Sequence, residues 1–223
     1  MNNILEQYET HWPTMVGKAF LCDRVVLHGQ DLHHQLGNWE WFKLYCFSFM
    51  RREIPDNQLK LLNFFWVATS YPDPSIWPNH IVALAGTTRS TASLALMAGL
   101  SVSEASIYGR RPEKRALDFF YRSQQAIEQG QTLEQVIQAE LALGRTIYGY
   151  GRPLAKLDER IPHTLALARK LGLAEGKHLQ LALSVYRYLK QRKGLSMNIA
   201  AIDAALAADI GLSPEEYQLV MSP

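Results

Sequence analysis

The sequence is poor in cysteine and has no excess of charge of either sign. Cys22 and Cys46 are the only cysteines in 223 residues, too few for the disulfide framework of a small secreted protein. No spacing of Cys and His resembles a zinc ligand set, so we expect no metal site. The 23 Lys and Arg residues nearly balance the 21 Asp and Glu residues, giving a net charge of +2. This balance excludes a dedicated nucleic-acid-binding protein.

Long hydrophobic runs are also missing. No basic start is followed by a long apolar stretch, so the sequence predicts no signal peptide and no membrane span. We expect a cytoplasmic protein without a membrane partner. Hydrophobic residues still make up 48% of the chain and charged residues 20%, which is typical of a chain that folds around a core.

Signals for helix ends recur along the chain, whereas signals for strands are rare. Proline is missing from three long tracts, 79–111, 113–152 and 163–213. Capping residues or capping boxes predict helix starts, and glycines predict helix ends. The starts are at Asp56, Thr132 and Ser213, and the ends are at Gly130, Gly172 and Gly211. We expect about nine or ten helices and one weak strand at 24–28, and therefore a mostly α fold.

The stretch 83–99 is unusually rich in small residues. Alanine, glycine and serine recur through it, and such residues allow another backbone to approach to an interhelical distance of about 8 Å. Two interpretations remain open, and both can hold at once. The stretch forms a tightly packed pair of helices, or the same helices form the interface of a homodimer.

The segment 144–153 cannot be the interior of a helix. It contains Gly144, Gly149 and Gly151 and ends at Pro153, residues that favour a loop. Such a loop allows close backbone approach, either to a neighbouring segment or to a ligand. Basic side chains on both sides of it, among them Arg145, suit a phosphorylated or carboxylated ligand. The Gly-x-Gly pattern is a weak signal by itself, because it lacks the spacing of a dinucleotide or Walker loop.

Four segments, taken in order, resemble the citrate synthase superfamily, especially its short citryl-CoA lyase branch. They are 23–32, 83–100, 149–153 with 158–160, and 197–200. The resemblance implies an all-α fold with a large lobe, 1–108 plus 197–223, and a small lobe, 109–196, with the site in the cleft between them. It also implies a homodimer through the helices of 83–99 and CoA or acyl-CoA as co-substrate.

The resemblance further implies a reaction at a carbon–carbon bond between an acyl-CoA and a keto acid or citrate-like carboxylate. Family members use two histidines and an aspartate base, and all three positions differ here. Tyr108 and Arg152 take the histidine positions and are the predicted catalytic residues, because a phenol or a guanidinium can stabilise an oxyanion. Ala200 takes the base position and cannot accept a proton. Aligning Asp203 there instead would spoil the match at 197–198.

Binding residues follow from the same resemblance. Arg160 keeps a substrate-binding position by residue type, and Asn198 lies in the segment that resembles the family's Asn-Val-Asp. Arg110 begins a basic run at the predicted start of a helix, where cations interact unfavourably with the helix dipole. A bound anion would offset this effect; the alternative is that the run is a solvated face. The predicted substrate-binding residues are therefore Arg160, Asn198 and Arg110, and the predicted CoA-binding residues are Gly149, Tyr150, Gly151 and Lys156.

Three functions fit these observations. The first is a diverged enzyme that acts on an acyl-CoA and a citrate-like carboxylate. The second is a catalytically inactive homologue, a pseudoenzyme, that binds CoA, a tricarboxylate or a partner protein in a regulatory or assembly role. The third is a protein whose cleft is filled and whose function lies on another surface. The polar replacements Tyr108 and Arg152 favour the first, and the missing base at Ala200 favours the second.

Overall fold

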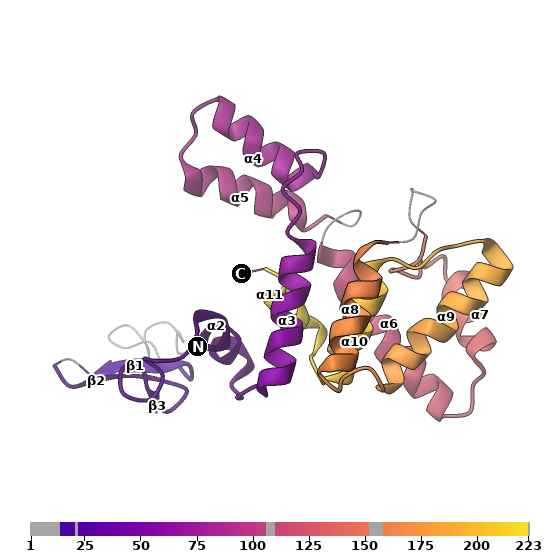
Figure 1. Cartoon of the computed structure of the whole chain (residues 1–223), viewed down its shortest axis with the longest axis horizontal. Coiled ribbons are helices and arrows are strands. Elements are labelled where there is room, and N and C mark those ends of the chain that lie inside the picture. The colour runs from indigo at the N-terminus through magenta and orange to yellow at the C-terminus, as the bar shows by residue number, and fades with distance from the viewer. Residues whose placement is uncertain (1–13, 21, 106–109, 152–157, 223) are drawn as a thin grey trace, which may run out of the picture. The chain divides into compact units, whose positions relative to one another are not determined.

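The computed structural model describes residues 14–20, 22–105, 110–151 and 158–222, with the backbone alone at Arg110. The chain divides into two compact units, Met1–Pro55 and Asp56–Pro223. Figure 1 shows the elements of each unit. The boundaries of the predicted large and small lobes stay a prediction.

The first unit consists of a small antiparallel sheet and one helix. The strands β1 (Gly17–Phe20), β2 (Arg24–Leu27) and β3 (Gln30–Asp31) pair in the order β1-β2-β3, and α2 (Trp41–Met50) follows. The ring Nε2 of His28 donates a hydrogen bond to the carbonyl of Ser48 at 2.7 Å, and its ring meets Phe47 edge-on. These contacts join the sheet to α2.

The sequence predicted only the middle strand of this sheet. β2 confirms the strand at 24–28, but β1 and β3 were missed. β1 is almost entirely exposed, so it lacks the alternation of apolar and polar residues that marks a half-buried strand. β3 has two residues, too few to form any pattern.

The second unit is built from helices. They are α3 (Asp56–Thr69), α4 (Trp77–Thr87), α5 (Ala92–Ser103), α6 (Arg110–Glu128), α7 (Leu133–Ala142), α8 (Arg160–Lys170), α9 (Lys177–Lys193), α10 (Ile199–Asp209) and α11 (Pro214–Val220). With α2 they make ten helices over the described residues, as the sequence predicted, and they confirm the all-α fold class.

Local signals placed several helix ends correctly. The side chains of Thr132 and Ser213 accept hydrogen bonds from the backbone N–H of Gln135 and Glu216, and both capping boxes are complete. Gly130, after α6, has a φ of 95°, a left-handed conformation that favours glycine at a helix end. α3 begins at Asp56, as predicted.

α10 is the central helix of the second unit. Nine of its eleven residues are buried, and it packs against α6, α8 and α9, while α11 packs against α6 (Figure 1). Its sequence is almost entirely alanine, isoleucine and leucine, and the small side chains allow neighbouring helices to approach closely. The helix therefore holds the elements around it in fixed positions.

α4 and α5 form a closely packed helix pair (Figure 1). A Cβ added at Gly99 would lie 2.6 Å from Cγ2 of Val82 and 3.3 Å from the carbonyl oxygen of Pro78, so the absence of a side chain at Gly99 allows the contact. Of the small residues of 83–99, Ala95 and Gly99 are buried and serve the packing of this pair. Among the described residues, no helix is long and apolar enough to cross a bilayer.

Candidate functional site

The loop at Gly149–Gly151 is held against the segment that leads into α10. The N–H of Gly151 donates to the carbonyl of Ser196 at 2.7 Å, and the N–H of Asn198 donates to the carbonyl of Gly149 at 2.9 Å. Tyr150 and Met197 form an antiparallel β-bridge between these two bonds. The loop and the start of α10 therefore form one rigid piece.

Gly149 allows this contact. Its φ is 89°, and an added Cβ would lie 2.7 Å from the backbone N and 2.8 Å from the Cα of Ala201. Real Cβ atoms essentially never approach so closely. Of the two interpretations that the sequence left open for this glycine, approach to a neighbouring segment is the one that the structure shows. Gly151, with a φ of 83°, meets only the Leu195 side chain at 3.5 Å.

A pocket of about 220 Å³ lies beside this loop. Its walls come from the end of α7, the loop and the end of α9, and it is lined by Leu141, Arg145, Thr146, Ile147, Tyr150, Leu189, Lys193 and Leu195. Most of these side chains are apolar. Arg145 and Lys193 are cationic, and none of the eight is a carboxylic acid. Arg145 also contacts Glu140 at 3.5 Å, but Arg122 holds that carboxylate more closely. The pocket therefore suits a ligand with an apolar or aromatic body and a negative charge.

Tyr150 belongs to the floor of this pocket rather than to its reactive groups. Its side chain is 5% exposed, and its hydroxyl donates a hydrogen bond to the carbonyl of Ala182 at 2.8 Å. Burial raises the pKa of Tyr150 well above its ordinary value, so the phenol stays protonated. Its role here is to shape the pocket.

Arg160 forms a buried, two-pronged ion pair with Asp158. The guanidinium Nε and Nη2 each donate to the carboxylate at 2.8 Å, and the Asp158 side chain has no solvent exposure. The same carboxylate accepts the backbone N–H of Ile199 at 2.9 Å, at the start of α10. Asp158 therefore connects α8 to the N-terminus of α10, where the helix dipole favours a negative charge.

Opposing effects act on both charges of this pair. Burial by itself disfavours the ionised form of Asp158, but the hydrogen bonds from Arg160 and Ile199 outweigh it and hold the pKa of Asp158 below its ordinary value. Burial likewise opposes the charge of Arg160, and the hydrogen bond to Asp158 raises the pKa of Arg160 above its ordinary value. The pair is therefore fully charged at neutral pH.

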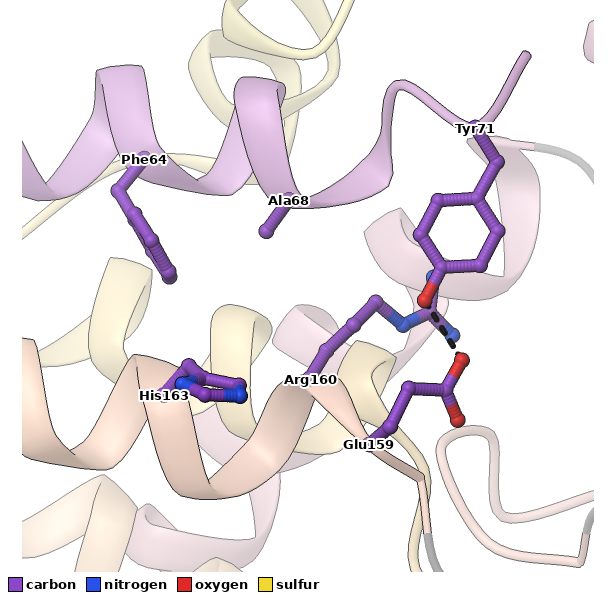
Figure 2. A pocket seen from close by; sticks show the side chains of 6 residues that line it. All are labelled: Phe64, Ala68, Tyr71, Glu159, Arg160 and His163. Carbon is purple, nitrogen blue, oxygen red and sulfur yellow. Dashed lines mark hydrogen bonds between the residues drawn. The ribbon is translucent and has the colours of Figure 1, made fainter.

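A second pocket, of about 340 Å³, lies between α3 and α8 (Figure 2). Phe64, Ala68 and Tyr71 line one side, and Glu159, Arg160 and His163 line the other. The Tyr71 hydroxyl donates to Glu159 at 2.6 Å, and the Arg160 guanidinium lies 5.2 Å from the centre of the Tyr71 ring. Asp158 occupies Nε and Nη2 of Arg160, which leaves the Nη1 side for a ligand.

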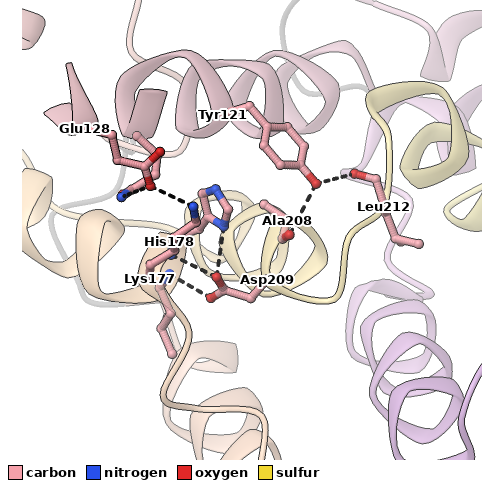
Figure 3. Close-up of polar contacts among 9 residues, drawn as sticks. Tyr121, Glu128, Lys177, His178, Ala208, Asp209 and Leu212 are labelled. Carbon is pink, nitrogen blue, oxygen red and sulfur yellow. Dashed lines mark hydrogen bonds and ion pairs between the residues drawn. The ribbon is translucent and has the colours of Figure 1, made fainter. Parts of the chain in front are cut away.

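Another buried polar cluster, around Asp209, has a structural role (Figure 3). Its carboxylate accepts the backbone N–H groups of His178 and Leu179 at 2.9 Å and also contacts His178 Nδ1 at 2.9 Å. The Tyr121 ring meets the His178 ring edge-on. Asp209 therefore caps the N-terminus of α9 from the end of α10. Among the described residues, no group of three or more His, Cys, Asp and Glu side chains is arranged to hold a metal ion.

Solved structures resemble this chain, although no protein-family model and no curated protein matches its sequence. Citryl-CoA lyase from Hydrogenobacter thermophilus gives a TM-score of 0.79 at 18% identity, covering 94% of this chain and 80% of that one. ATP citrate lyase from Methanosaeta concilii gives 0.76 at 18%, covering 97% and 38%. Citrate synthase from Thermoplasma acidophilum gives 0.63 at 14%, covering 82% and 49%.

This chain has the citrate synthase-like fold. The fold that the four sequence segments implied is thereby confirmed. At these levels of identity the likeness concerns the fold, and the roles of individual residues come from the geometry of this chain.

The citrate synthase-like fold brings together some of the predicted site residues. Gly149, Tyr150 and Gly151 lie beside the α7–α9 pocket, and Arg160 lies at the α3–α8 pocket. Asn198 is the N-cap of α10, and its side chain accepts the backbone N–H of Ala200 at 3.0 Å.

Several other predicted residues fall outside what the structure describes. Tyr108, Arg152 and Lys156 lie outside the described residues, as does the side chain of Arg110. Their predicted catalytic and binding roles stay predictions.

Sequence reasoning did not single out Lys193 or Tyr71. Lys193 belongs to a basic last turn of α9 with Lys190 and Arg192, which is the usual preference of a helix C-terminus for cations. Nothing in that pattern distinguishes Lys193, which lines a pocket, from the other two cations. Tyr71 stands 89 residues from Arg160 in the sequence (160 − 71), so only the packing of α3 on α8 reveals their contact.

Proposed function

We propose that this protein is a cytoplasmic, diverged citrate synthase-like enzyme that binds CoA or acyl-CoA beside the Gly149–Gly151 loop. It forms or cleaves a carbon–carbon bond between the acyl group and a citrate-like carboxylate. The α7–α9 pocket carries this proposal, because it combines apolar walls with two cations and no carboxylic acid. CoA has matching chemistry, an aromatic base with phosphate groups attached.

The solved structures support the same ligand class. The Methanosaeta concilii ATP citrate lyase is in complex with citryl-CoA, and the Thermoplasma acidophilum citrate synthase is in complex with carboxymethyl CoA and oxaloacetate. In this chain we assign the phosphate contacts to Arg145 and Lys193, together with Lys156. Arg160, with its Nη1 side turned from Asp158, binds a substrate carboxylate, supported by Asn198 and Arg110. Tyr108 and Arg152 stabilise the oxyanion.

Calorimetric titration with CoA tests the pocket. We expect Arg145→Ala and Lys193→Ala each to weaken CoA binding about tenfold, because each removes one charge-assisted hydrogen bond to a phosphate. Arg192→Ala is the matched control: it removes a cation from the same turn of α9, but Arg192 pairs with Glu134 and does not line the pocket. Absence of heat from the wild-type protein at millimolar CoA would contradict the proposal, as would an equal loss in the control.

A second candidate function is binding without catalysis. It is favoured by Ala200, the second residue of α10, where the resemblance implies a carboxylate base; loss of a positioned base costs on the order of 10²–10⁴ in rate. Citryl-CoA offered to the wild-type protein separates the two candidates. Release of acetyl-CoA supports the enzyme, whereas tight binding with no product supports a pseudoenzyme.

We further propose that the protein forms a homodimer through α4 and α5. The pair exposes a set of large apolar side chains that a single copy leaves in water: Trp77, Leu84, Leu94, Leu96, Met97 and Leu100. Exposed apolar patches of this kind mark interaction surfaces. The absence of buried residues on α4 agrees with a face that is covered only on association.

The dimer can be dissociated by a charge on this face. We expect Met97→Asp to yield a monomer in light scattering at concentrations where the wild-type protein is a dimer, because an aspartate in an apolar interface is desolvated without a partner. Leu143→Asp is the control, since Leu143 is equally exposed but lies after α7. A wild-type monomer at high concentration would overturn the assignment.

A further inference from the structure

Asp203 is a carboxyl group in the interior of an apolar helix. It lies in the middle of α10 and is 1% exposed, and its neighbours on both sides along the helix are buried alanine and isoleucine. Its Oδ1 is buried and has no hydrogen-bond partner. A charged carboxylate in that position would be desolvated without compensation, which is among the costliest arrangements in a protein interior.

The charged groups that act on Asp203 come from two packed helices and the loop beside them. Glu113 of α6 and Asp158, before α8, repel its negative charge, and Arg160 of α8 attracts it. From α9, which also packs on α10, the described residues contribute no charge to this group; His178 contacts Asp209 instead. Burial, and then Glu113, raise the pKa of Asp203 well above its ordinary value.

Arg160 therefore has one hydrogen-bonded charged partner, Asp158, and one uncharged carboxyl, Asp203, acting on it from α10. Glu159 lines the same pocket, and its carboxylate accepts the Tyr71 hydroxyl. The Asp158 carboxylate accepts hydrogen bonds both from Arg160 and from the backbone N–H of Ile199 at the start of α10. Because it also interacts with the positive end of that helix, it does not fully neutralise the guanidinium. If Asp203 were ionised, a second buried carboxylate would compete for Arg160, and an incoming anion would be repelled. With Asp203 neutral, the Nη1 side of Arg160 keeps its attraction for an anion.

We propose that Asp203 is a positioning residue: an uncharged carboxylic acid whose proton keeps Arg160 available to bind a substrate carboxylate. This proposal rests on the proposed function, since it deepens the role of Arg160 in that same site. Binding of the carboxylate and retention of the Asp203 proton are then linked. Each favours the other, and raising the pH removes the proton and weakens binding.

The first experiment needs no ligand. A carboxyl whose pKa is raised on folding destabilises the native state at high pH. There the unfolded chain has already lost the proton, whereas the folded protein must either take it up from solution or bury the charge. We expect Asp203→Asn to unfold at higher urea than the wild-type protein at about pH 8, and the difference to shrink towards about pH 4. Asp118→Asn, on the exposed side of α6, is the control. If wild type and Asp203→Asn respond to pH in parallel, Asp203 is ionised and the proposal is overturned.

The second experiment measures citrate binding by calorimetry from neutral to alkaline pH. One linked proton makes the wild-type affinity fall by up to tenfold per pH unit above the titration of Asp203, whereas Asp203→Asn should bind citrate with little dependence on pH. Where Asp203 is partly ionised, the wild-type protein should also take up protons on binding, seen as a difference in heat between buffers of unlike ionisation enthalpy. An identical pH dependence in both proteins would overturn the positioning role. Absence of citrate binding by both proteins, alongside different stability profiles, would instead overturn the proposed function and leave the buried acid in place.

Discussion

Asp158→Ala should destabilise the protein by about 3–5 kcal/mol, the range expected when one partner of a buried ion pair is removed. The change leaves the Arg160 guanidinium, whose side chain is 20% exposed, without its two-pronged partner. It also removes the acceptor for the Ile199 N–H at the start of α10. Chemical denaturation at neutral pH measures the loss.

The matched control is Asp118→Ala. Asp118 also pairs with an arginine, Arg122 at 2.9 Å, but the two side chains are 52% and 42% exposed and stand one helical turn apart on α6. Exposed pairs of this kind contribute about 0–1 kcal/mol. An equal loss in both variants would mean that Asp158 is not the connection between α8 and α10 that its hydrogen bonds indicate.

The Asp158 pair also has a defined pH dependence. Because the pKa of Asp158 is lowered on folding from its ordinary 3.8, its stabilising contribution is fully present above that value and is lost as the pH falls through the lower, folded pKa. The difference between wild type and Asp158→Ala should therefore be constant at neutral pH and shrink below about pH 4. The pH dependence at Asp203 has the opposite sign: its pKa is raised on folding, so stability falls as the pH rises.

Much of the second unit could be predicted from local chemistry. The capping boxes at Thr132 and Ser213 and the glycine after α6 act within one helical turn, so the sequence alone contains the information. The tight α4–α5 pair was predictable for a similar reason, since small side chains in two consecutive helices favour close packing.

The site was less predictable because it is made by contacts distant in sequence. Gly149 was recognised as a loop residue, but that its neighbour is Ala201 of α10 depends on tertiary packing. Arg160 was assigned to a substrate, and its hydrogen bonds to Asp158 add a structural task that no spacing rule reveals. Asp203 did give a signal, a single acid in a run of alanine and isoleucine. Its neighbours on α6 and α8 were needed to interpret it.

The contacts at the start of α10 bear on Ala200, the position where the resemblance implies a carboxylate base. Two hydrogen bonds fix the first turn of α10: the backbone N–H of Ile199 donates to Asp158, and the backbone N–H of Ala200 donates to the N-cap Asn198. The turn therefore needs no acid at Ala200 for stability. The citryl-CoA experiment tests the proposed catalysis by Tyr108 and Arg152.

Gly149→Ala should destabilise the protein by roughly 2–5 kcal/mol. A left-handed backbone costs a residue with a Cβ about 1–2 kcal/mol, and overpacking adds about 1–3 kcal/mol. The overpacking is unavoidable because the Cβ meets the backbone N and Cα of Ala201 at 2.7 and 2.8 Å, atoms that no rotamer change can move. We expect the loop to leave α10, and CoA binding to weaken along with stability.

Gly144→Ala separates the two causes. Gly144 has a φ of 67° but has nothing within 4 Å of an added Cβ, so this variant carries the backbone strain without the collision and should lose only about 1–2 kcal/mol. Urea denaturation and CoA calorimetry on both variants measure the difference. If Gly144→Ala is as damaging as Gly149→Ala, left-handed strain alone explains both losses. The contact between the loop and Ala201 then does not hold the proposed CoA pocket in shape.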